Sequence, residues 1–533
     1  MTVNRIPDVV PNAGVTAATL RRRWWALGAL SLAMLVLTLD VTVLTVALPT
    51  LAGALDASES DMQWFFTAYL VALVAAVLPI GLVGDRFGRK PLLVAGLIAF
   101  GAGSAALAYS PSAAAFIGLR VGLGLAAAAI IVMTISFITV LFDEAERPRA
   151  IGIWGAANFL GLPLGPILGG WILSNAWWGW IFLINVPIAL VALAAVLSFM
   201  PGSRADRAPG LDIGGVLLSA GGLAALMYGI IEAGDNGWGD PTAIGFMAGG
   251  LVVLVLFALW EAWLTARSGA SALVDLSLFR SPSFTWGTLL TAFGLFGLYG
   301  VLFVLPQYTQ AIMGLDPQGS GLRLLPAIGG LVVGAVPAHR VAARIGAKLS
   351  VAAGFAVLAA GLALGATMTA SSGDGLMAAW SFVAGLGGGL GFATAASAAL
   401  VELSAERSGV GSAVLQAINK LAPALGAAIL GSVLNATYQA QVHVAGLPAQ
   451  AVDTTQSSVF GGLSVAQRLG SATHLASVQT AFVAGLDDAL RVGALVVLIG
   501  VVVALALLPA GESERRRIAR ASGTDTASAN PLA

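Results

Sequence analysis

Long apolar runs constrain this chain more than any other feature. An α-helix needs about 20 mostly apolar residues to cross a bilayer, and such runs follow one another along most of the 533 residues. Hydrophobic residues make up 58% of the chain and charged residues 10%, against about 25% charged residues in soluble domains. We therefore expect an all-α integral membrane protein with fourteen spans, near residues 24–48, 63–84, 91–109, 113–140, 150–173, 179–199, 213–232, 242–263, 284–307, 321–338, 349–369, 376–401, 409–433 and 487–508.

The basic residues set the orientation of these spans, because cytoplasmic loops hold an excess of Lys and Arg. With both termini in the cytoplasm, all but five of the 26 basic residues fall in cytoplasmic segments. Four of the five lie in or at the edge of spans: Arg120, Arg323, Lys420 and Arg491. The fifth, Arg468, lies in a segment on the external side. The apolar run from Trp24 to Pro49 is too long for a typical signal peptide and predicts an uncleaved first span.

A charged turn separates the second and third predicted spans. It contains Gly81, Asp85, Arg86, Gly88 and Arg89. Glycines let helices approach closely, and a carboxylate beside a helix N-terminus is stabilised by the helix dipole and by nearby arginines. Such contacts could hold the cytoplasmic side closed and break as the two halves move. The alternative is a charge cluster that only sets topology.

A sequence similar to that of this turn occurs later in the chain. Residues 85–90 (Asp-Arg-Phe-Gly-Arg-Lys) resemble residues 343–348 (Ala-Arg-Ile-Gly-Ala-Lys). Parallel repeats of this kind build two transporter halves around a central cavity. The chain is predicted to have five parts. They are a cytoplasmic N-terminus (1–23), a six-helix bundle (24–199), a linker with two inserted helices (200–283), a second six-helix bundle (284–508) that contains a long external loop (434–486), and a disordered tail (509–533).

Asp40 is the first candidate functional residue because it lies inside the first apolar run. An ionisable group at this depth is costly and is a functional hypothesis by default. Burial favours the protonated form of a carboxylate, so this group could bind and release protons. Arg120 lies at a comparable depth in the fourth span, so we expect the pair to exchange their contact for a proton or a cationic substrate. A permanent structural pair is the alternative.

The fifth predicted span is dense in glycine and proline. Proline kinks a helix, and small residues allow close helix packing. From these residues alone the span is a kinked packing helix, with the relevant positions Gly161, Gly165, Pro166, Gly169 and Gly170.

A substrate cavity near the membrane centre would draw on aromatic and polar residues. Lys420 lies near the middle of the thirteenth span, where it could tune substrate charge or simply pack or reach toward the interface. The candidate cavity residues are Tyr69, Asn158, Phe293, Tyr299, Gln416 and Lys420.

Several classes of function lack their signatures. The chain has no cysteine, its three histidines are far apart, and no Gly-Lys-Ser/Thr phosphate loop occurs. No Gly-x-Ser-x-Gly nucleophile elbow occurs either. We therefore expect no metal, no cofactor, no nucleic acid and no enzymatic activity, with energy taken from an ion gradient or from substrate.

An ordered set of motifs resembles the fourteen-helix drug:proton antiporters of the major facilitator superfamily, the EmrB/QacA type. The resemblance covers nearly all of residues 24–508. Its motifs are Asp40–Pro49, Gly81–Lys90, Leu119–Gly124, Gly161–Gly170, Trp180–Pro187 and Leu324–Pro326. The sequence departs from the family pattern at Leu123, where a glutamine is usual, and at Lys420, an unusual cation for a cation cavity.

The resemblance implies a proton-coupled multidrug efflux antiporter that exports lipophilic, cationic compounds by alternating access. It assigns proton coupling to Asp40 and Arg120 and marks Gly161–Gly170 as the motif of exporters. The expected setting is the plasma membrane, with a monomeric protein and drugs, protons and lipid as its partners. The alternatives are a dedicated exporter of one endogenous metabolite, antibiotic or lipid and, from another class, a non-transporting membrane sensor.

Overall fold

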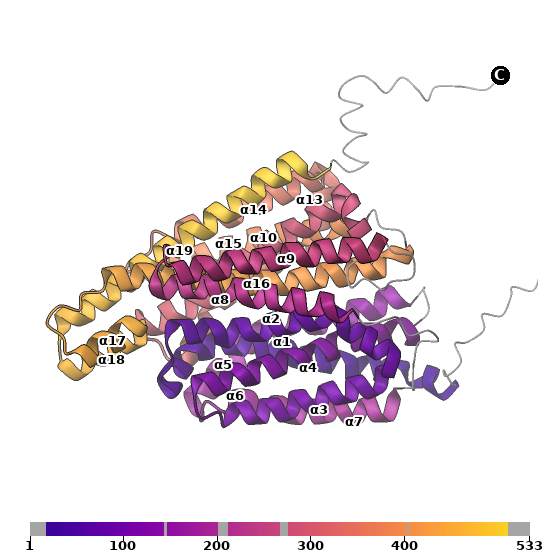
Figure 1. Ribbon diagram of the computed structural model, residues 1–533, viewed down its shortest axis with the longest axis horizontal. Coiled ribbons are helices and arrows are strands. Elements are labelled where there is room, and N and C mark those ends of the chain that lie inside the picture. The colour runs from indigo at the N-terminus through magenta and orange to yellow at the C-terminus, as the bar shows by residue number, and fades with distance from the viewer. Residues whose placement is uncertain (1–16, 143–145, 201–211, 267–275, 402–404, 510–533) are drawn as a thin grey trace, which may run out of the picture.

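The protein folds into a bundle of long helices that run roughly along one axis (Figure 1). The computed structural model describes residues 17–142, 146–200, 212–266, 276–401 and 405–509. Every regular element within these ranges is a helix. The first part of the predicted linker segment 200–283, residues 201–211, and nearly all of the predicted tail 509–533 lie outside them.

The first half of the chain forms one group of helices, coloured indigo and purple in Figure 1. Ser58 and Asp61 form a capping box that starts the second helix: the Asp61 amide donates to Ser58 Oγ (3.1 Å), and the Ser58 amide donates to Asp61 Oδ2 (3.0 Å). The predicted sixth span, 179–199, is interrupted at Ile184. The helices are α1 (Ala17–Leu55), α2 (Glu59–Phe87), α3 (Arg89–Ala108), α4 (Ala113–Leu141), α5 (Arg147–Asn175), α6 (Trp180–Leu183) and α7 (Asn185–Phe199).

The second group of helices comes from the C-terminal part of the chain. The predicted tenth span, 321–338, ends at a bend of 46° between residues 317–335 and residues 338–345. The helices are α10 (Pro282–Ala311), α11 (Pro317–Arg323), α12 (Leu325–Ala335), α13 (Ala338–Ile345), α14 (Ala347–Gly365), α15 (Asp374–Val401), α16 (Ala405–Gln441) and α19 (Ala472–Leu507).

Two further helices link the groups. Helix α8 (Ile213–Asn236) packs against α2 and α16, and α9 (Pro241–Ala266) packs on α8. Apolar residues such as Leu251, Leu256 and Leu259 cover the outer face of α9 and are exposed. An exposed apolar surface of this extent suits contact with lipid. A short 3₁₀ helix, η1 (Leu276–Arg280), leads into α10.

The repeated turn has the same geometry in both halves. Gly88 ends α2 and starts α3 with φ 105°, and Gly346 ends α13 and starts α14 with φ 91°. This region of φ favours glycine because a Cβ would be strained there. We call the side of the bundle that carries Gly88 and Gly346 the turn end.

At the opposite side, which we call the hairpin end, α17 (Ala449–Ser457) and α18 (Val459–Leu469) form a helical hairpin (Figure 1). The predicted loop 434–486 is therefore mostly helical, because α16 continues to Gln441 and α19 begins at Ala472. Tyr438 of α16 anchors the hairpin by donating from its hydroxyl to the carbonyl of Thr455 (2.8 Å).

The described residues contain twelve helices long and apolar enough to cross a membrane, or thirteen if the bent pair around Ala335 is one span. The fifth predicted span coincides with α5, which has 29 residues, but several of its side chains lie outside the described part of the chain. The count of fourteen therefore stays a prediction.

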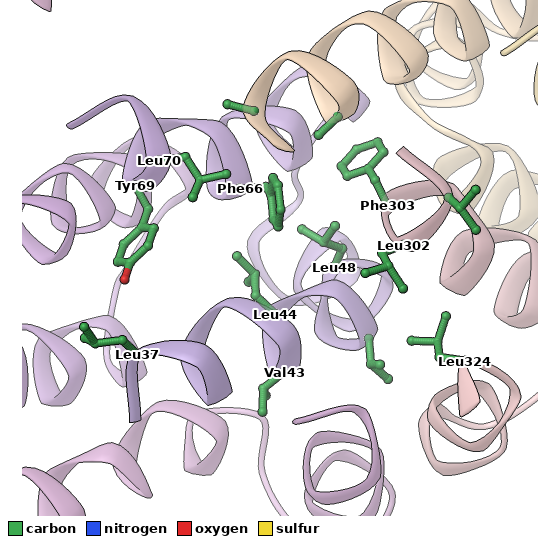
Figure 2. Packing of buried hydrophobic residues seen from close by; sticks show 14 of the residues in the cluster. Leu37, Val43, Leu44, Leu48, Phe66, Tyr69, Leu70, Leu302, Phe303 and Leu324 are labelled. Atoms are coloured by element: carbon green, nitrogen blue, oxygen red, sulfur yellow. The ribbon is translucent and has the colours of Figure 1, made fainter. Parts of the chain in front are cut away.

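The two groups of helices meet in an apolar layer near the hairpin end. Figure 2 shows Leu44, Leu48 and Phe66 of α1 and α2 pointing toward Leu302 and Phe303 of α10. All five side chains are buried. Burial of apolar area contributes about 25 cal/mol per Å² in water, and this layer closes the hairpin end to water.

Polar contacts reinforce the closed end. Gln307 Nε2 of α10 donates to the buried Glu59 carboxylate at the start of α2 (3.2 Å). Gln310 Nε2 donates to the carbonyl of Val46 (3.0 Å). Both bonds join one half of the molecule to the other, so opening this end would have to break them.

Candidate functional site

A buried ion pair lies at the centre of the first half. Arg120 Nη1 of α4 lies 2.6 Å from Asp40 Oδ2 of α1, and neither side chain has any exposed surface. The structure thus brings together the two residues that the sequence analysis paired by depth. A buried pair of opposite charges is held by its geometry, and removing one partner alone costs about 3–5 kcal/mol.

Three other groups hold this pair. Asn185 Nδ2 at the start of α7 donates to Asp40 Oδ1 (3.1 Å), and Arg120 Nε donates to the carbonyl of Phe65 (2.8 Å). The Arg120 guanidinium also lies over the Tyr69 ring, 4.3 Å from its centre. Both carboxylate oxygens of Asp40 therefore accept a hydrogen bond. Arg120 Nη2 is buried and has no partner among the described residues.

A cavity of about 180 Å³ lies between the two halves. Helices α1, α2, α4 and α5 line it from one half, and α10, α12, α15 and α16 from the other. On α1 the lining residues recur at helical spacing, from Met34 through Thr38 and Thr42 to Thr45. Asp40 lies between these positions and faces away from the cavity toward Arg120.

Tyr69 connects the ion pair to the cavity. Its ring lines the cavity and also covers the Arg120 guanidinium. Figure 2 shows Tyr69 on α2 beside Leu70, with its hydroxyl directed toward Leu37 of α1. Tyr69 thus contacts both the buried charges and the space in which a substrate would lie.

The predicted cavity residues have different outcomes. Tyr69, Tyr299 and Lys420 line the cavity. Phe293 is not among the lining residues; its ring lies against α19, where a Cβ built on Gly500 would come within 3.2 Å of Phe293 Cγ.

The side chains of Asn158 and Gln416 lie outside the described part of the chain. Phe392 of α15 and Asn419 of α16 also line the cavity, and Asn185 binds Asp40; none of these three roles was predicted from the sequence.

Glycines let α5 approach α1 closely. A Cβ on Gly161 would lie 2.7 Å from Thr38 Cβ, and one on Gly169 would lie 2.9 Å from Val43 Cγ1. Thr42 Oγ1 donates to the carbonyl of Gly161 (3.1 Å) and also blocks the position of a Cβ on Gly165. This is close packing of the kind that small residues permit in membrane helices.

The same helix contacts the other half at the hairpin end. A Cβ on Gly170 would lie 2.6 Å from the carbonyl oxygen of Pro317, and Gly321 of α11 packs against the carbonyl of Pro166. Ser174 Oγ donates to Asp316 Oδ2 (2.9 Å). Helix α5 is therefore wedged between α1 of its own half and α11 of the other.

The charged turn lies at the turn end of the bundle. Gly88 provides the positive φ of the turn, and Arg86 lies over the Phe87 ring, 5.7 Å from its centre. Gly81 faces α4, where a Cβ would lie 3.7 Å from Val132 Cγ1. The Asp85 side chain lies outside the described part of the chain, and Arg89 is the first residue of α3. The gating role of this turn stays a prediction.

Solved structures of membrane transporters share this fold. A bacterial homologue of the human lysosomal transporter Spinster, inward-facing and unoccupied, matches with a TM-score of 0.66 at 16% identity, over 94% of this chain and 99% of its own. A D-xylose–proton symporter matches with a TM-score of 0.56 at 14% identity, over 92% of this chain and 99% of its own. At these identities the likeness concerns the fold alone.

Sequence comparison gives the family. The tetracenomycin C resistance and export protein of Streptomyces glaucescens is 31% identical over 94% of this chain and 95% of its own length. The multidrug efflux pump LfrA of Mycolicibacterium smegmatis is 31% identical over 91% and 96%, respectively. The Major Facilitator Superfamily profile matches residues 30–427. The chain is therefore a multi-pass membrane protein that belongs to the Major Facilitator Superfamily, a family of transporters and not of enzymes.

Proposed function

We propose that the protein is a proton-coupled antiporter that exports amphipathic drugs by alternating access. One observation carries the proposal: the Asp40–Arg120 pair is sealed from water, and the Tyr69 ring that covers Arg120 also lines the cavity. An intramembrane carboxylate paired in this way is suited to proton coupling. A change in its charge can reach a substrate through one aromatic side chain.

Protonation is the step that would change the conformation. A protonated Asp40 no longer attracts Arg120 as a charge, so the guanidinium is free to move from its place over Tyr69. That movement alters the cavity wall and favours substrate release at the hairpin end. Deprotonation restores the pair, closes the hairpin end and favours substrate capture at the turn end.

The direction of transport rests on two supports. Helix α5 is wedged between α1 and α11, so its packing links the position of one half to the closure of the hairpin end. The relatives are named for resistance, efflux and export. We infer a monomer in the plasma membrane, with both termini and the turn end in the cytoplasm and the hairpin end outside.

A dedicated exporter of one compound is the second candidate. The cavity of about 180 Å³ is smaller than the roughly 300–1,000 Å³ of typical small-molecule sites. One relative is named for a single compound, tetracenomycin C. A narrow substrate range would favour this candidate, whereas binding without any flux would favour the membrane sensor.

The test is flux in liposomes that contain the purified full chain. An imposed pH gradient should drive accumulation of ethidium, a lipophilic cation, or of fluorescein, an aromatic anion. Asp40→Asn should abolish gradient-driven accumulation, because the neutral amide cannot exchange a proton. Thermal unfolding of the variant should be followed in parallel, because Arg120 would be left buried without its partner.

Asp374→Asn is the matched control. Asp374 also lies 2.6 Å from an arginine, Arg323, but this pair is partly exposed and outside the cavity. The control should transport like the natural protein. Flux that persists in Asp40→Asn would remove the coupling role of Asp40, and flux of neither dye would favour the dedicated exporter.

A further inference from the structure

Lys420 gives the cavity an unusual charge. It lies on α16 and is the one charged side chain among the described residues that line the cavity. The remaining lining residues are apolar, aromatic or uncharged polar groups. The family resemblance implied lipophilic cations as substrates, but this wall presents a cation to them.

The ammonium of Lys420 has no carboxylate partner among the described residues. Asp40 faces away from the cavity. Its carboxylate already accepts hydrogen bonds from Arg120 and Asn185 and has no exposed surface. An ammonium removed from bulk water without a counter-charge is costly. A ligand with a negative charge near Lys420 would therefore bind more favourably, because it would supply the missing counter-charge.

The neighbour of Lys420 adds hydrogen-bond donors of the right kind. Asn419 lines the cavity beside Lys420, and its side-chain amide lies 2.8 Å from Thr291 Oγ1. An amide NH₂ and an ammonium are both donors. Together they match an anionic oxygen, whereas a cationic head group would find no acceptor charge beside them.

Aromatic rings complete the site. Tyr69 of α2, Tyr299 of α10 and Phe392 of α15 line the same cavity. Flat ring systems pack well against such side chains in stacked or edge-to-face contacts. The ligand that this wall favours is therefore an aromatic compound that carries a negative charge at one edge.

We propose that the cavity takes amphipathic aromatic acids, whose carboxylate or phenolate binds Lys420 and Asn419 while the ring packs between Tyr69 and Tyr299. This inference rests on the proposed function, because it assigns the substrate class of the same transport site. It names lipophilic anions, where the family resemblance implied lipophilic cations.

Calorimetric titration of the purified full chain tests the proposal without any pH gradient. The probes share one ring system and differ in charge: 2-naphthoate, the neutral 2-naphthylmethanol and the cation 2-naphthylmethylammonium. We expect 2-naphthoate to bind tightest to the natural protein. Lys420→Gln should weaken 2-naphthoate by at least about tenfold and leave 2-naphthylmethanol unchanged, while Lys420→Arg should retain most of the affinity for 2-naphthoate.

Charge reversal makes the test independent of any loss of folding. Lys420→Glu should bind the ammonium probe in preference to 2-naphthoate, a gain that an unfolded protein cannot show. The proposal is overturned if the cation binds the natural protein as tightly as 2-naphthoate, if Lys420→Gln leaves the 2-naphthoate affinity unchanged, or if no probe binds saturably. Failure of the transport proposal would appear instead in the flux of Asp40→Asn, so the two results are separable.

Discussion

The Arg120 guanidinium lies 4.3 Å from the centre of the Tyr69 ring, in the wall between the buried ion pair and the cavity. A cation over an aromatic ring away from water is stabilised by about 2 kcal/mol. A substrate that displaces the ring therefore acts on Arg120 directly. This relationship turns a buried salt bridge into a candidate coupling device.

Tyr69→Leu should lower the number of protons moved per substrate molecule, because the ring that joins Arg120 to the cavity is lost. Tyr69→Phe keeps the ring and should keep the coupling ratio. The ratio is measured in liposomes from simultaneous substrate flux and internal pH. Tyr299→Leu is the control, since Tyr299 lines the cavity and lies outside the Arg120 contacts. It should weaken binding and leave the ratio intact.

Asn185→Leu should lower gradient-driven transport by about tenfold or more. Asn185 Nδ2 donates to Asp40 Oδ1 (3.1 Å), and leucine cannot replace this bond. A hydrogen bond to a charged group contributes about 1.5–3 kcal/mol, and each 1.4 kcal/mol corresponds to a factor of about ten. Ser104→Ala is the matched control, because Ser104 contacts Asn185 at 3.4 Å but not Asp40. Unchanged flux in Asn185→Leu would mean that this bond does not support the coupling carboxylate.

Gly170→Leu should prevent full closure of the hairpin end. A Cβ at this position would lie 2.6 Å from the carbonyl oxygen of Pro317 and 2.8 Å from Gln318 Cα, both of them backbone atoms of the other half. Because the chain has no cysteine, a single Gln310→Cys can report on this end. Its alkylation by a water-soluble maleimide should rise in Gly170→Leu.

Gly53→Leu is the control for that measurement. Gly53 lies near the end of α1, and a Cβ there would meet no atom within 4 Å. The same side chain should fit at this position and leave alkylation of the reporter unchanged. Equal alkylation in both variants would remove α5 from the closure of the hairpin end.

The sequence predicted the features that depend on local chemistry. Apolar runs revealed the spans, and charges inside such runs singled out Asp40 and Arg120, because few charged residues occur there. Asn185 was missed because an amide in an apolar run carries a weaker signal. Its contact with Asp40 depends on the rotation of α7 about its own axis relative to α1. A local sequence pattern does not contain that information.

Helical geometry explains the outcome for the cavity aromatics. On α10 the lining residues Leu295, Leu298, Tyr299 and Leu302 follow the spacing of one helix face. Phe293 stands six residues before Tyr299, which is about 240° around the helix, and so it faces α19 instead. If Tyr299 is taken as a lining residue, the helical periodicity excludes Phe293 from the cavity wall.

The membrane potential should distinguish an anionic substrate from a cationic one. Export of an anion in exchange for a proton moves two positive charges inward per cycle, whereas export of a cation for a proton moves none. Each charge that crosses 100 mV contributes about 2.3 kcal/mol. In liposomes with a fixed pH gradient, a valinomycin-imposed potential, negative on the side from which substrate is exported, should accelerate fluorescein export and leave ethidium export unaffected. Lys420→Glu should remove the accelerated anion flux, because the cavity would then repel the anion. Equal responses of the two dyes to the potential would contradict an anion-selective cavity.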